Sequence, residues 1–266
     1  TTLARRMMEQ TKIYKALKGV RGRKPVDLAA LEQLMVRFSQ LVVEQRWIKE
    51  IDINPMLASP ERLVALDARV VVHDAELTED KLPKLSIRPY PAQYISKFTM
   101  KNGTEVEIRP IRPEDEPAMV QFHETLSDRT VYLRYLQLLK LSQRVAHERL
   151  TRICFIDYDR EMALVAERKN PATGNPEILG VGRLQKAHGT NEAEFAAVVS
   201  DSHQGQGLGK ELVRRLLLVA RGEGIRRVRA DILGDNTTMQ RICENIGFKL
   251  HRDLSDPTIE AEALIE

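Results

Sequence analysis

One glycine-rich stretch decides the fold prediction for this chain: Gln204-Gly205-Gln206-Gly207-Leu208-Gly209-Lys210. It follows an apolar run at Ala196–Val199, typical of a strand, and precedes a segment that places Leu212, Leu216 and Ala220 on one helical face. A strand, a glycine loop and a helix in this order direct several unpaired N–H groups to one point, where the helix dipole adds positive charge. The stretch therefore predicts an anion site, most naturally for phosphate.

The segments on both sides of the glycine loop alternate between strand and helix patterns. Before the loop, strands are predicted at Glu105–Arg109, Ala163–Arg168, Ile178–Lys186 and Glu192–Ser200. Helical patterns begin at Pro113 and run from Val131 to Ile153. After the loop, helices are predicted at Gly207–Gly222 and Thr237–Ile246, and strands at Arg227–Ile232, Phe248–His251 and Ile259–Leu264. This order predicts an α/β domain over residues 104–266.

The residues before position 104 have a different organisation. Two helical and two strand patterns occur there, in the order Leu3–Leu17, Leu28–Arg46, Ile48–Asn54 and Leu63–Val72. Pro55–Glu61 is predicted as the loop between the two strands. Prolines at positions 83, 89 and 91 fix the backbone and remove hydrogen-bond donors. We therefore predict a small α/β piece over residues 1–78 and a linker over residues 79–103.

Composition excludes several classes of protein. The 266 residues include 41 Lys and Arg against 38 Asp and Glu, a net charge of +3, which is weak for a nucleic-acid binder. No stretch approaches the roughly 18 apolar residues that span a bilayer. Cys154 and Cys243 are too few for a disulfide framework. These features predict a cytoplasmic protein without nucleic-acid or membrane partners, and the start at Thr1 without a methionine suggests a fragment of a longer chain.

The glycine loop resembles a known cofactor-binding motif. Gln204, Gly207 and Gly209 stand in the register Gln/Arg-x-x-Gly-x-Gly/Ala of the acyl-CoA pyrophosphate loop in the GNAT superfamily of N-acetyltransferases, whereas Glu211 after Lys210 does not fit a P-loop. The resemblance covers residues 104–264 and implies a mixed, mostly antiparallel sheet flanked by helices, with acetyl-CoA as co-substrate. The residues that it implies for CoA binding are Val198, Val199, Gln204, Gly205, Gln206, Gly207, Leu208, Gly209, Lys210 and Asn236. Asn236 is equally suited to cap the helix that begins at Thr237.

Acetyl transfer to an amine requires a base, because a free lysine is neutral in only about one molecule in 2,500 at pH 7. Glu192 and Glu194 share one face of their strand. Glu194 lies close to where many GNAT enzymes carry their catalytic glutamate, so we predict Glu194 as general base and Glu192 as its substitute. Both could instead be solvent-exposed strand carboxylates. A backbone N–H near Val199 is the expected oxyanion donor.

The usual GNAT acid, a tyrosine shortly after the last helix, is missing, because residues 248–255 contain none. Either a water or Tyr158 could protonate the leaving thiol, whose pKa near 8.5 requires little help. For Tyr158, a packing role is favoured. No metal is predicted in this domain, since the chemistry requires none.

The first 78 residues resemble the end of an ATP-grasp domain from ADP-forming acyl-CoA synthetases. The resemblance rests on Glu50–Pro55 followed by Ala65–Arg69. It implies that Asn54 and Asp67 occupy vestigial magnesium positions, although Asn54-Pro55 could simply begin a turn. Most of an ATP-grasp fold would lie upstream of Thr1, so no ATP turnover is expected.

An ATP-grasp tail, a proline-containing linker and a GNAT domain together resemble the C-terminal part of bacterial Pat-type protein lysine acetyltransferases. The resemblance implies Nε-acetylation of proteins such as AMP-forming acetyl-CoA synthetase, with a homo-oligomeric intact protein. One alternative is a small-molecule amine N-acetyltransferase, which would need an acid-rich acceptor cleft; the candidate acids are Glu114, Asp115, Glu116, Asp157 and Asp159. The other is a non-catalytic CoA-sensing module of an acyl-CoA synthetase.

Overall fold

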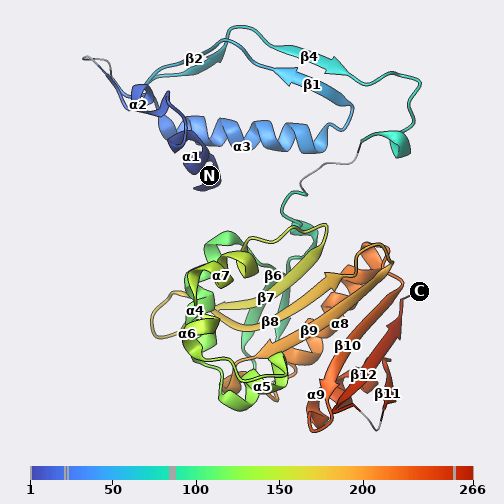
Figure 1. Ribbon diagram of the computed structural model, residues 1–266. Helices are drawn as coiled ribbons and strands as arrows, with labels where there is room; N and C mark the ends of the chain where they lie inside the picture. The colour runs from blue at the N-terminus through green and yellow to red at the C-terminus, as the bar shows by residue number, and fades with distance from the viewer. Residues whose placement is uncertain (1, 21, 23, 84–87, 254–255, 266) are drawn as a thin grey trace. The chain divides into compact units, whose positions relative to one another are not determined.

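The computed structural model describes residues 2–20, 22, 24–83, 88–253 and 256–265. The chain divides into two compact units, Thr1–Ser86 and Ile87–Glu266 (Figure 1). Among the described residues, no helix combines the length and the apolar character needed to cross a bilayer.

The described part of the first unit contains helices α1 (Thr2–Glu9), α2 (Tyr14–Leu17) and α3 (Leu28–Glu44), strands β1 (Ile48–Asp52), β2 (Met56–Ala58), β3 (Leu63–Ala65) and β4 (Arg69–Val72), and the 3-10 turn η1 (Glu79–Lys81). Antiparallel pairs form between β1 and β4 and between β2 and β3. The side chain of Asp27 accepts a hydrogen bond from the Ala30 N–H at 2.9 Å and caps α3.

The sequence patterns of the first unit differ from the structure in three places. The expected helix Leu3–Leu17 is interrupted between α1 and α2, where the Thr11 hydroxyl donates to the Met8 carbonyl oxygen at 2.6 Å and so competes with the helix. The expected strand Leu63–Val72 is two strands, because the chain changes its pairing partner from β2 to β1. Strand β2 accordingly lies in the expected loop Pro55–Glu61.

In the described part of the second unit, eight strands form one sheet in the order β11-β12-β10-β9-β8-β7-β6-β5. Their bounds are β5 Ser96–Thr99, β6 Glu105–Pro110, β7 Glu161–Lys169, β8 Pro176–Lys186, β9 Glu192–Val199, β10 Arg227–Leu233, β11 Lys249–Arg252 and β12 Thr258–Leu264. Neighbouring strands are antiparallel except β9 and β10, which are parallel. The expected mixed, mostly antiparallel sheet is confirmed.

Helices cover both faces of this sheet. Helices α4 (Glu116–Glu124), α5 (Asp128–Tyr135), α6 (Leu141–Arg144) and α7 (His147–Cys154) precede β7, α8 (Leu208–Gly222) follows β9, and α9 (Thr237–Asn245) follows β10. Side chains alternate along β7, so Leu164 packs in the core with α8 whereas Val165 packs in the core with α4 and α7. The site described below therefore has α8 on one side of the sheet and α4–α7 on the other (Figure 1).

Two further sequence expectations differ from the second unit. Strand β5 pairs with β6 and lies inside the expected linker 79–103, because the prolines that suggested a linker end at Pro91. The helical pattern Val131–Ile153 is divided into α5, α6 and α7. Leu136 has φ +57° and ends α5 in the left-handed conformation, which a helix cannot continue.

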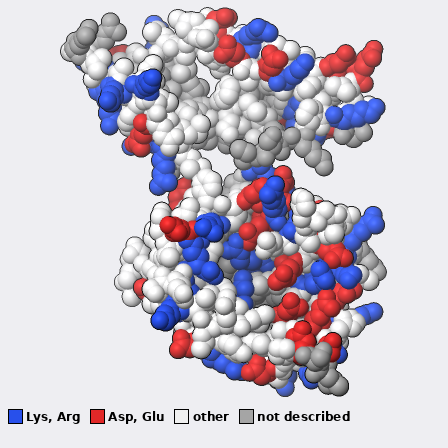
Figure 2. Space-filling model, in the orientation of Figure 1, with Lys and Arg blue, Asp and Glu red and all other residues white. Residues whose placement is uncertain are grey.

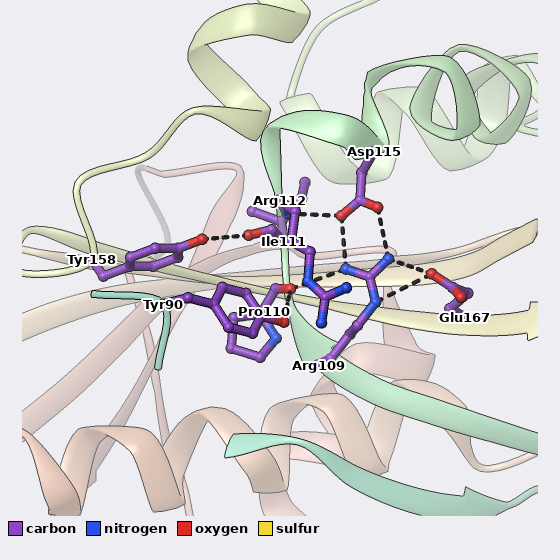
Figure 3. Close-up of polar contacts among 8 residues, drawn as sticks. All are labelled: Tyr90, Arg109, Pro110, Ile111, Arg112, Asp115, Tyr158 and Glu167. Atoms are coloured by element: carbon purple, nitrogen blue, oxygen red, sulfur yellow. Dashed lines mark hydrogen bonds and ion pairs between the residues drawn. The ribbon is translucent and has the colours of Figure 1, made fainter. Parts of the chain in front are cut away.

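A buried ion-pair network fixes the start of α4 (Figure 3). The Arg109 guanidinium on β6 donates to both oxygens of Asp115, at 2.8 and 2.6 Å, and also contacts Glu167 on β7. Asp115 in turn accepts a hydrogen bond from the Arg112 N–H at 2.7 Å, in the short 3-10 turn η3 (Pro113–Asp115). Because the carboxylate of Asp115 is bound on two sides, the network sets where α4 leaves the sheet.

Candidate active site

Strands β9 and β10 stop pairing in the middle of the sheet. Their parallel register includes Glu192, Ala193 and Glu194, whereas β9 stays paired with β8 as far as Val199. The N–H of the next residue, Ser200, donates to Leu179 on β8 at 2.9 Å. Since N–H groups alternate in direction along a strand, the N–H of Val199 points to the opposite edge, where β10 no longer pairs. The expected oxyanion donor thus faces an opening in the sheet.

A cavity of about 490–510 Å³ lies on each side of this opening. The larger one, here called the loop cavity, is about 510 Å³ and is lined by the glycine loop and α9. Its lining includes eight of the residues expected to bind CoA: Val198, Val199, Gln204, Gly205, Gly207, Gly209, Lys210 and Asn236. Gln206 is outside this lining, and its carbonyl oxygen accepts from the Lys101 N–H at 3.1 Å. Leu208 is also outside it and is 1 % exposed, packed in the core.

The glycine loop has a conformation that requires glycine. Gly205 and Gly207 have φ +74° and +87°, in the left-handed region that side chains with a Cβ disfavour. The chain then enters α8 at Leu208, so the unpaired N–H groups of the first helical turn face the cavity end of the loop. This arrangement suits a pyrophosphate group.

The strand before the loop is tied to α5 by hydrogen bonds. The Gln204 Nε2 amide donates to the Val199 carbonyl oxygen and to Thr130 Oγ1, both at 3.1 Å. Asp201 accepts from the Ser127 hydroxyl at 2.6 Å and from the Thr130 hydroxyl at 3.0 Å. Burial alone would raise the pKa of Asp201, but these hydrogen bonds outweigh it and hold the pKa below its usual value. These hydrogen bonds connect the start of the loop to α5.

Asn236 serves as a helix cap and also borders the loop cavity. Its Oδ1 accepts from the Met239 N–H at 3.2 Å, which caps α9. The residue is also part of the cavity lining. The two roles left open by the sequence are thus compatible in this geometry.

The second cavity, here called the acceptor cavity, is about 490 Å³ and lies on the α4–α7 side of the sheet. Its lining includes Met119, Phe122, His123, Arg134, Tyr135, Ala146, Glu148, Arg149, Arg152, Ile153, Glu161, Val181, Arg183, Gln185 and Val198. Arg134 and Val198 line both cavities. A group in one cavity can therefore approach a group in the other at these two residues.

The two expected base residues differ in their surroundings. Glu192 forms ion pairs with Arg227 at 3.5 Å and with Arg229 at 3.3 Å. Glu194 is exposed and, among the described residues, makes no hydrogen bond or ion pair, although the Arg134 charge acts on it. Gln185 lies opposite Glu194 in the antiparallel ladder and lines the acceptor cavity, so both side chains project on that face. Of the two expected bases, Glu194 is thus the one whose carboxylate is unpaired, and it is not among the described residues that line either cavity.

Tyr158 does not reach either cavity among the described lining residues. Its hydroxyl donates to the Ile111 carbonyl oxygen at 2.7 Å, and burial raises its pKa (Figure 3). Tyr135 on α5 does line the acceptor cavity, as does its neighbour Arg134. Sequence reasoning missed both residues, because nothing in the pattern of α5 shows which of its faces meets the opening between β9 and β10.

The acids proposed for an acid-rich cleft lie elsewhere. Asp115 is buried against Arg109, Glu116 contacts His147 at 2.5 Å, and Asp157 lies 3.6 Å from Arg160. None of the five candidate acids occurs among the described residues that line the two cavities.

Comparison with known proteins identifies the second unit. The sequence model of the acetyltransferase (GNAT) domain matches residues 105–249, more than half of the chain. The chain belongs to the GNAT acetyltransferase family. This GNAT protein carries in addition a match to the ATP-grasp domain over residues 1–72.

Three relatives describe the two parts of this GNAT acetyltransferase. Acetyltransferase PA5475 of Pseudomonas aeruginosa is 32 % identical over 160 residues, which are 60 % of this chain and 83 % of that protein. Acetyltransferase Pat of Mycolicibacterium smegmatis is 28 % identical over 161 residues, again 60 % of this chain but 44 % of Pat. The beta subunit of ADP-forming acetate–CoA ligase I of Pyrococcus furiosus is 42 % identical over 66 residues, 25 % of this chain and 28 % of that subunit.

A solved structure supports the same assignment. The GNAT domain of S. lividans PAT superimposes with a TM-score of 0.59 and 27 % identity, covering 66 % of this chain and 99 % of that domain. The protein is therefore an acetyltransferase in which residues 1–72 match the ATP-grasp domain, and acetyl-CoA is the co-substrate of its family. The loop cavity fits this co-substrate, because its glycine loop presents unpaired N–H groups at a helix start.

Proposed function

We propose that this GNAT acetyltransferase transfers acetyl from acetyl-CoA to the Nε of lysine side chains on other proteins. One observation supports the proposal: the loop cavity and the acceptor cavity meet at Arg134 and Val198. The exposed carboxylate of Glu194 lies on the same face of β9 as Val198, outside the described lining of both cavities. The rim of the acceptor cavity includes the exposed residues Glu148 and Arg152, so a side chain from a second protein can enter it. Relatives named Pat and PA5475 share the domain.

In this proposal each group has a defined task. Glu194 takes a proton from the acceptor ammonium, directly or through one water. The neutral amine then attacks the acetyl carbonyl carbon, the C–N bond forms, and the C–S bond breaks with the electron pair leaving on sulfur. The Val199 N–H donates to the carbonyl oxygen as negative charge develops there. The nitrogen then loses its second proton and the thiolate gains one, directly or through solvent, because the CoA thiol has a pKa near 8.5.

The loop residues hold the CoA part in this scheme. Gly205, Gly207 and Gly209 let the backbone approach the pyrophosphate, and the N-terminus of α8 supplies partial positive charge. Gln204, Lys210 and Asn236 line the same cavity with polar groups. Among the carboxylates considered, Glu192 is less suited to accept a proton because two arginines already neutralise it.

The acceptor is a protein of the cytoplasm in this proposal, and AMP-forming acetyl-CoA synthetase is the first candidate. The ATP-grasp fragment supports this choice, because it links the acetyltransferase to a region similar to acyl-CoA synthetases. Both cysteines are buried and unpaired, as expected in a reducing compartment. In the intact protein we propose a homo-oligomer. Asn54 and Asp67 remain proposed relics of a magnesium site, and the Asn54 N–H donates to the Asp67 carbonyl oxygen at 3.2 Å.

The decisive experiment compares wild type with Glu194→Gln, using acetyl-CoA and purified AMP-forming acetyl-CoA synthetase. Acetyl-lysine is measured by mass spectrometry and thiol release by absorbance. We expect transfer by the wild type and a loss of about 10²–10⁴-fold in the variant. Glu105→Gln serves as the matched control, because Glu105 is an exposed strand carboxylate on β6.

Other results would select the alternatives. Transfer to small amines without transfer to any protein would favour the small-molecule acetyltransferase. Binding of acetyl-CoA with no transfer to either kind of acceptor would favour the CoA-sensing module. Equal activity of wild type and Glu194→Gln on protein would leave lysine acetylation standing and remove Glu194 as the base.

A further inference from the structure

The wall of the acceptor cavity carries an excess of positive charge. Its charged lining residues are Arg134, Arg149, Arg152, Arg183, Glu148 and Glu161. Arg183 donates to Glu161 at 2.5 Å, so this pair is neutral as a unit. Three guanidinium groups then remain against the single carboxylate of Glu148 among the described lining residues, and Glu194, outside the lining, adds one further carboxylate near Arg134. Figure 2 shows basic side chains gathered over α7, β7 and β8, on the face where this cavity opens.

Two of these arginines have no carboxylate within hydrogen-bond or ion-pair distance among the described residues. The guanidinium carbons of Arg134 and Arg149 lie 4.9 and 5.3 Å from the centre of the Tyr135 ring. Among the described residues, neither guanidinium makes a hydrogen bond or an ion pair, and Arg149 Nε is buried without a partner. Burial lowers the pKa of Arg134, and Arg183 and Arg149 lower it further, whereas Tyr135 and Glu194 act in the opposite direction.

His123 is a third polar side chain of this cavity that has no hydrogen-bond partner among the described residues. Its side chain is 1 % exposed and belongs to the cavity lining, yet neither ring nitrogen has a hydrogen-bond partner among the described residues. Burial, together with the charges of Arg144 and Arg149, lowers its pKa to about 4. The ring is therefore neutral at pH 7 and offers one N–H donor and one acceptor to a polar ligand.

Such a wall is matched to a ligand that carries negative charge. Desolvated guanidinium groups without partners are unfavourable, and a carboxylate supplies the planar pair of acceptors that a guanidinium binds best. A lysine ammonium alone would meet repulsion from the same three arginines. An acceptor that brings a carboxylate beside its amine removes both problems.

We propose that the acceptor cavity binds a carboxylate located next to the reacting amine, so that the preferred substrates are lysines flanked by aspartate or glutamate. This inference rests on the proposed function, because it names the acceptor class for that site. The arginine charges also lower the pKa of the bound amine and increase its neutral fraction. Arg134, which lines both cavities, is placed to act on the amine and on the carboxylate.

The first test compares peptides that differ only in the residues flanking one lysine. With acetyl-CoA present, kcat/KM is measured by thiol release for peptides with glutamate or glutamine at these positions, and for free lysine. We expect glutamate peptides to exceed glutamine peptides by about 10–100-fold, the scale of a hydrogen-bonded charge. A preference for free lysine over every peptide would overturn the proposal, since the carboxylate would then be the α-carboxylate of an amino acid.

The second test asks whether the preference for glutamate peptides depends on the arginines of the acceptor cavity. In Arg149→Gln and Arg134→Gln the ratio between glutamate and glutamine peptides is expected to fall to about one-tenth of the wild-type ratio or less. Arg149→Lys should keep part of the preference for glutamate peptides, because lysine retains the positive charge but cannot form the two parallel hydrogen bonds of a guanidinium. Arg221→Gln is the control, because Arg221 is exposed on α8 and outside both cavities among the described residues, and it should keep the wild-type ratio.

The two proposals fail in different ways. Equal kcat/KM for glutamate and glutamine peptides in the wild type would overturn the carboxylate site and leave lysine acetylation in place. If no peptide is acetylated, lysine acetylation is decided by the assay with acetyl-CoA synthetase, and calorimetric titration of both peptides into CoA-loaded protein decides whether the carboxylate site exists. Tighter binding of the glutamate peptide by tenfold or more would then support the site, and equal binding would overturn it.

Discussion

The guanidinium of Arg88 forms two hydrogen bonds with the carboxylate of Glu223, at 2.5 and 2.7 Å. Glu223 ends α8 and also accepts from the Tyr94 hydroxyl at 2.8 Å, so the segment before β5 is attached to the helix that follows the glycine loop. Lys186 on β8 lies 3.4 Å from the same carboxylate. The helix that begins at the glycine loop is thus anchored at its other end.

Glu223→Gln should destabilise the second unit by about 1–3 kcal/mol, because Arg88 loses its ionised partner. Burial alone would raise the pKa of Glu223, but Arg88 and Tyr94 lower it overall. A lowered folded-state pKa adds stability above the unfolded pKa of about 4.3, and this stability is lost as pH falls through the folded value. The stability that Glu223 contributes is measured by thermal unfolding, monitored with circular dichroism, at pH values from 7 to 3. If the stability difference between wild type and Glu223→Gln were the same at pH 3 as at pH 7, this explanation would be wrong.

Gly207→Ala should weaken CoA binding by about tenfold or more, since alanine at φ +87° strains the loop by roughly 1–2 kcal/mol. Calorimetric titration of CoA gives the dissociation constant. Gly224→Ala is a matched control: Gly224 has φ +68° and open space around its missing Cβ, but it lies after α8 at the far end from the loop. The control should lose similar stability and keep its CoA affinity. If both variants lost CoA affinity equally, backbone strain anywhere in the domain, and not only in the glycine loop, would be enough to weaken CoA binding.

Tyr158→Phe should lose about 1 kcal/mol of stability and keep kcat, because the hydroxyl bonds to the Ile111 carbonyl oxygen and lies away from both cavities. Urea unfolding and thiol release measure the two quantities. A drop in kcat of tenfold or more, with normal CoA binding, would restore Tyr158 as the general acid.

Cys154 and Cys243 should resist alkylation in the folded protein. They are 1 % and 0 % exposed, and burial raises the pKa of each thiol to about 12, so neither forms thiolate at pH 8. Iodoacetamide labelling followed by mass spectrometry should give negligible modification in buffer and complete modification in urea. Rapid labelling of either cysteine in buffer would mean that its surroundings open locally.

The sequence predicted the second unit well where local pattern and packing agree. The glycine loop, the strand before it and the helix after it carry their own signals, and the structure places Val199, Gln204 and Gly207 on one cavity. The division of Leu63–Val72 was not predictable, because it depends on a change of strand partner. Arg134, Arg149 and His123 were missed for a related reason: three helix positions far apart in sequence meet only when α4, α5 and α7 pack on the sheet.

Arg134 and Val198 form a wall common to two cavities that open on different sides of one sheet. Two substrates can therefore be bound at the same time, each entering by its own route, and the reaction needs no covalent acyl-enzyme stage. A single compound that joins CoA to a lysine peptide through the acetyl carbon would span both cavities. It would bind more tightly than either half, because only one molecule loses its translational freedom on binding.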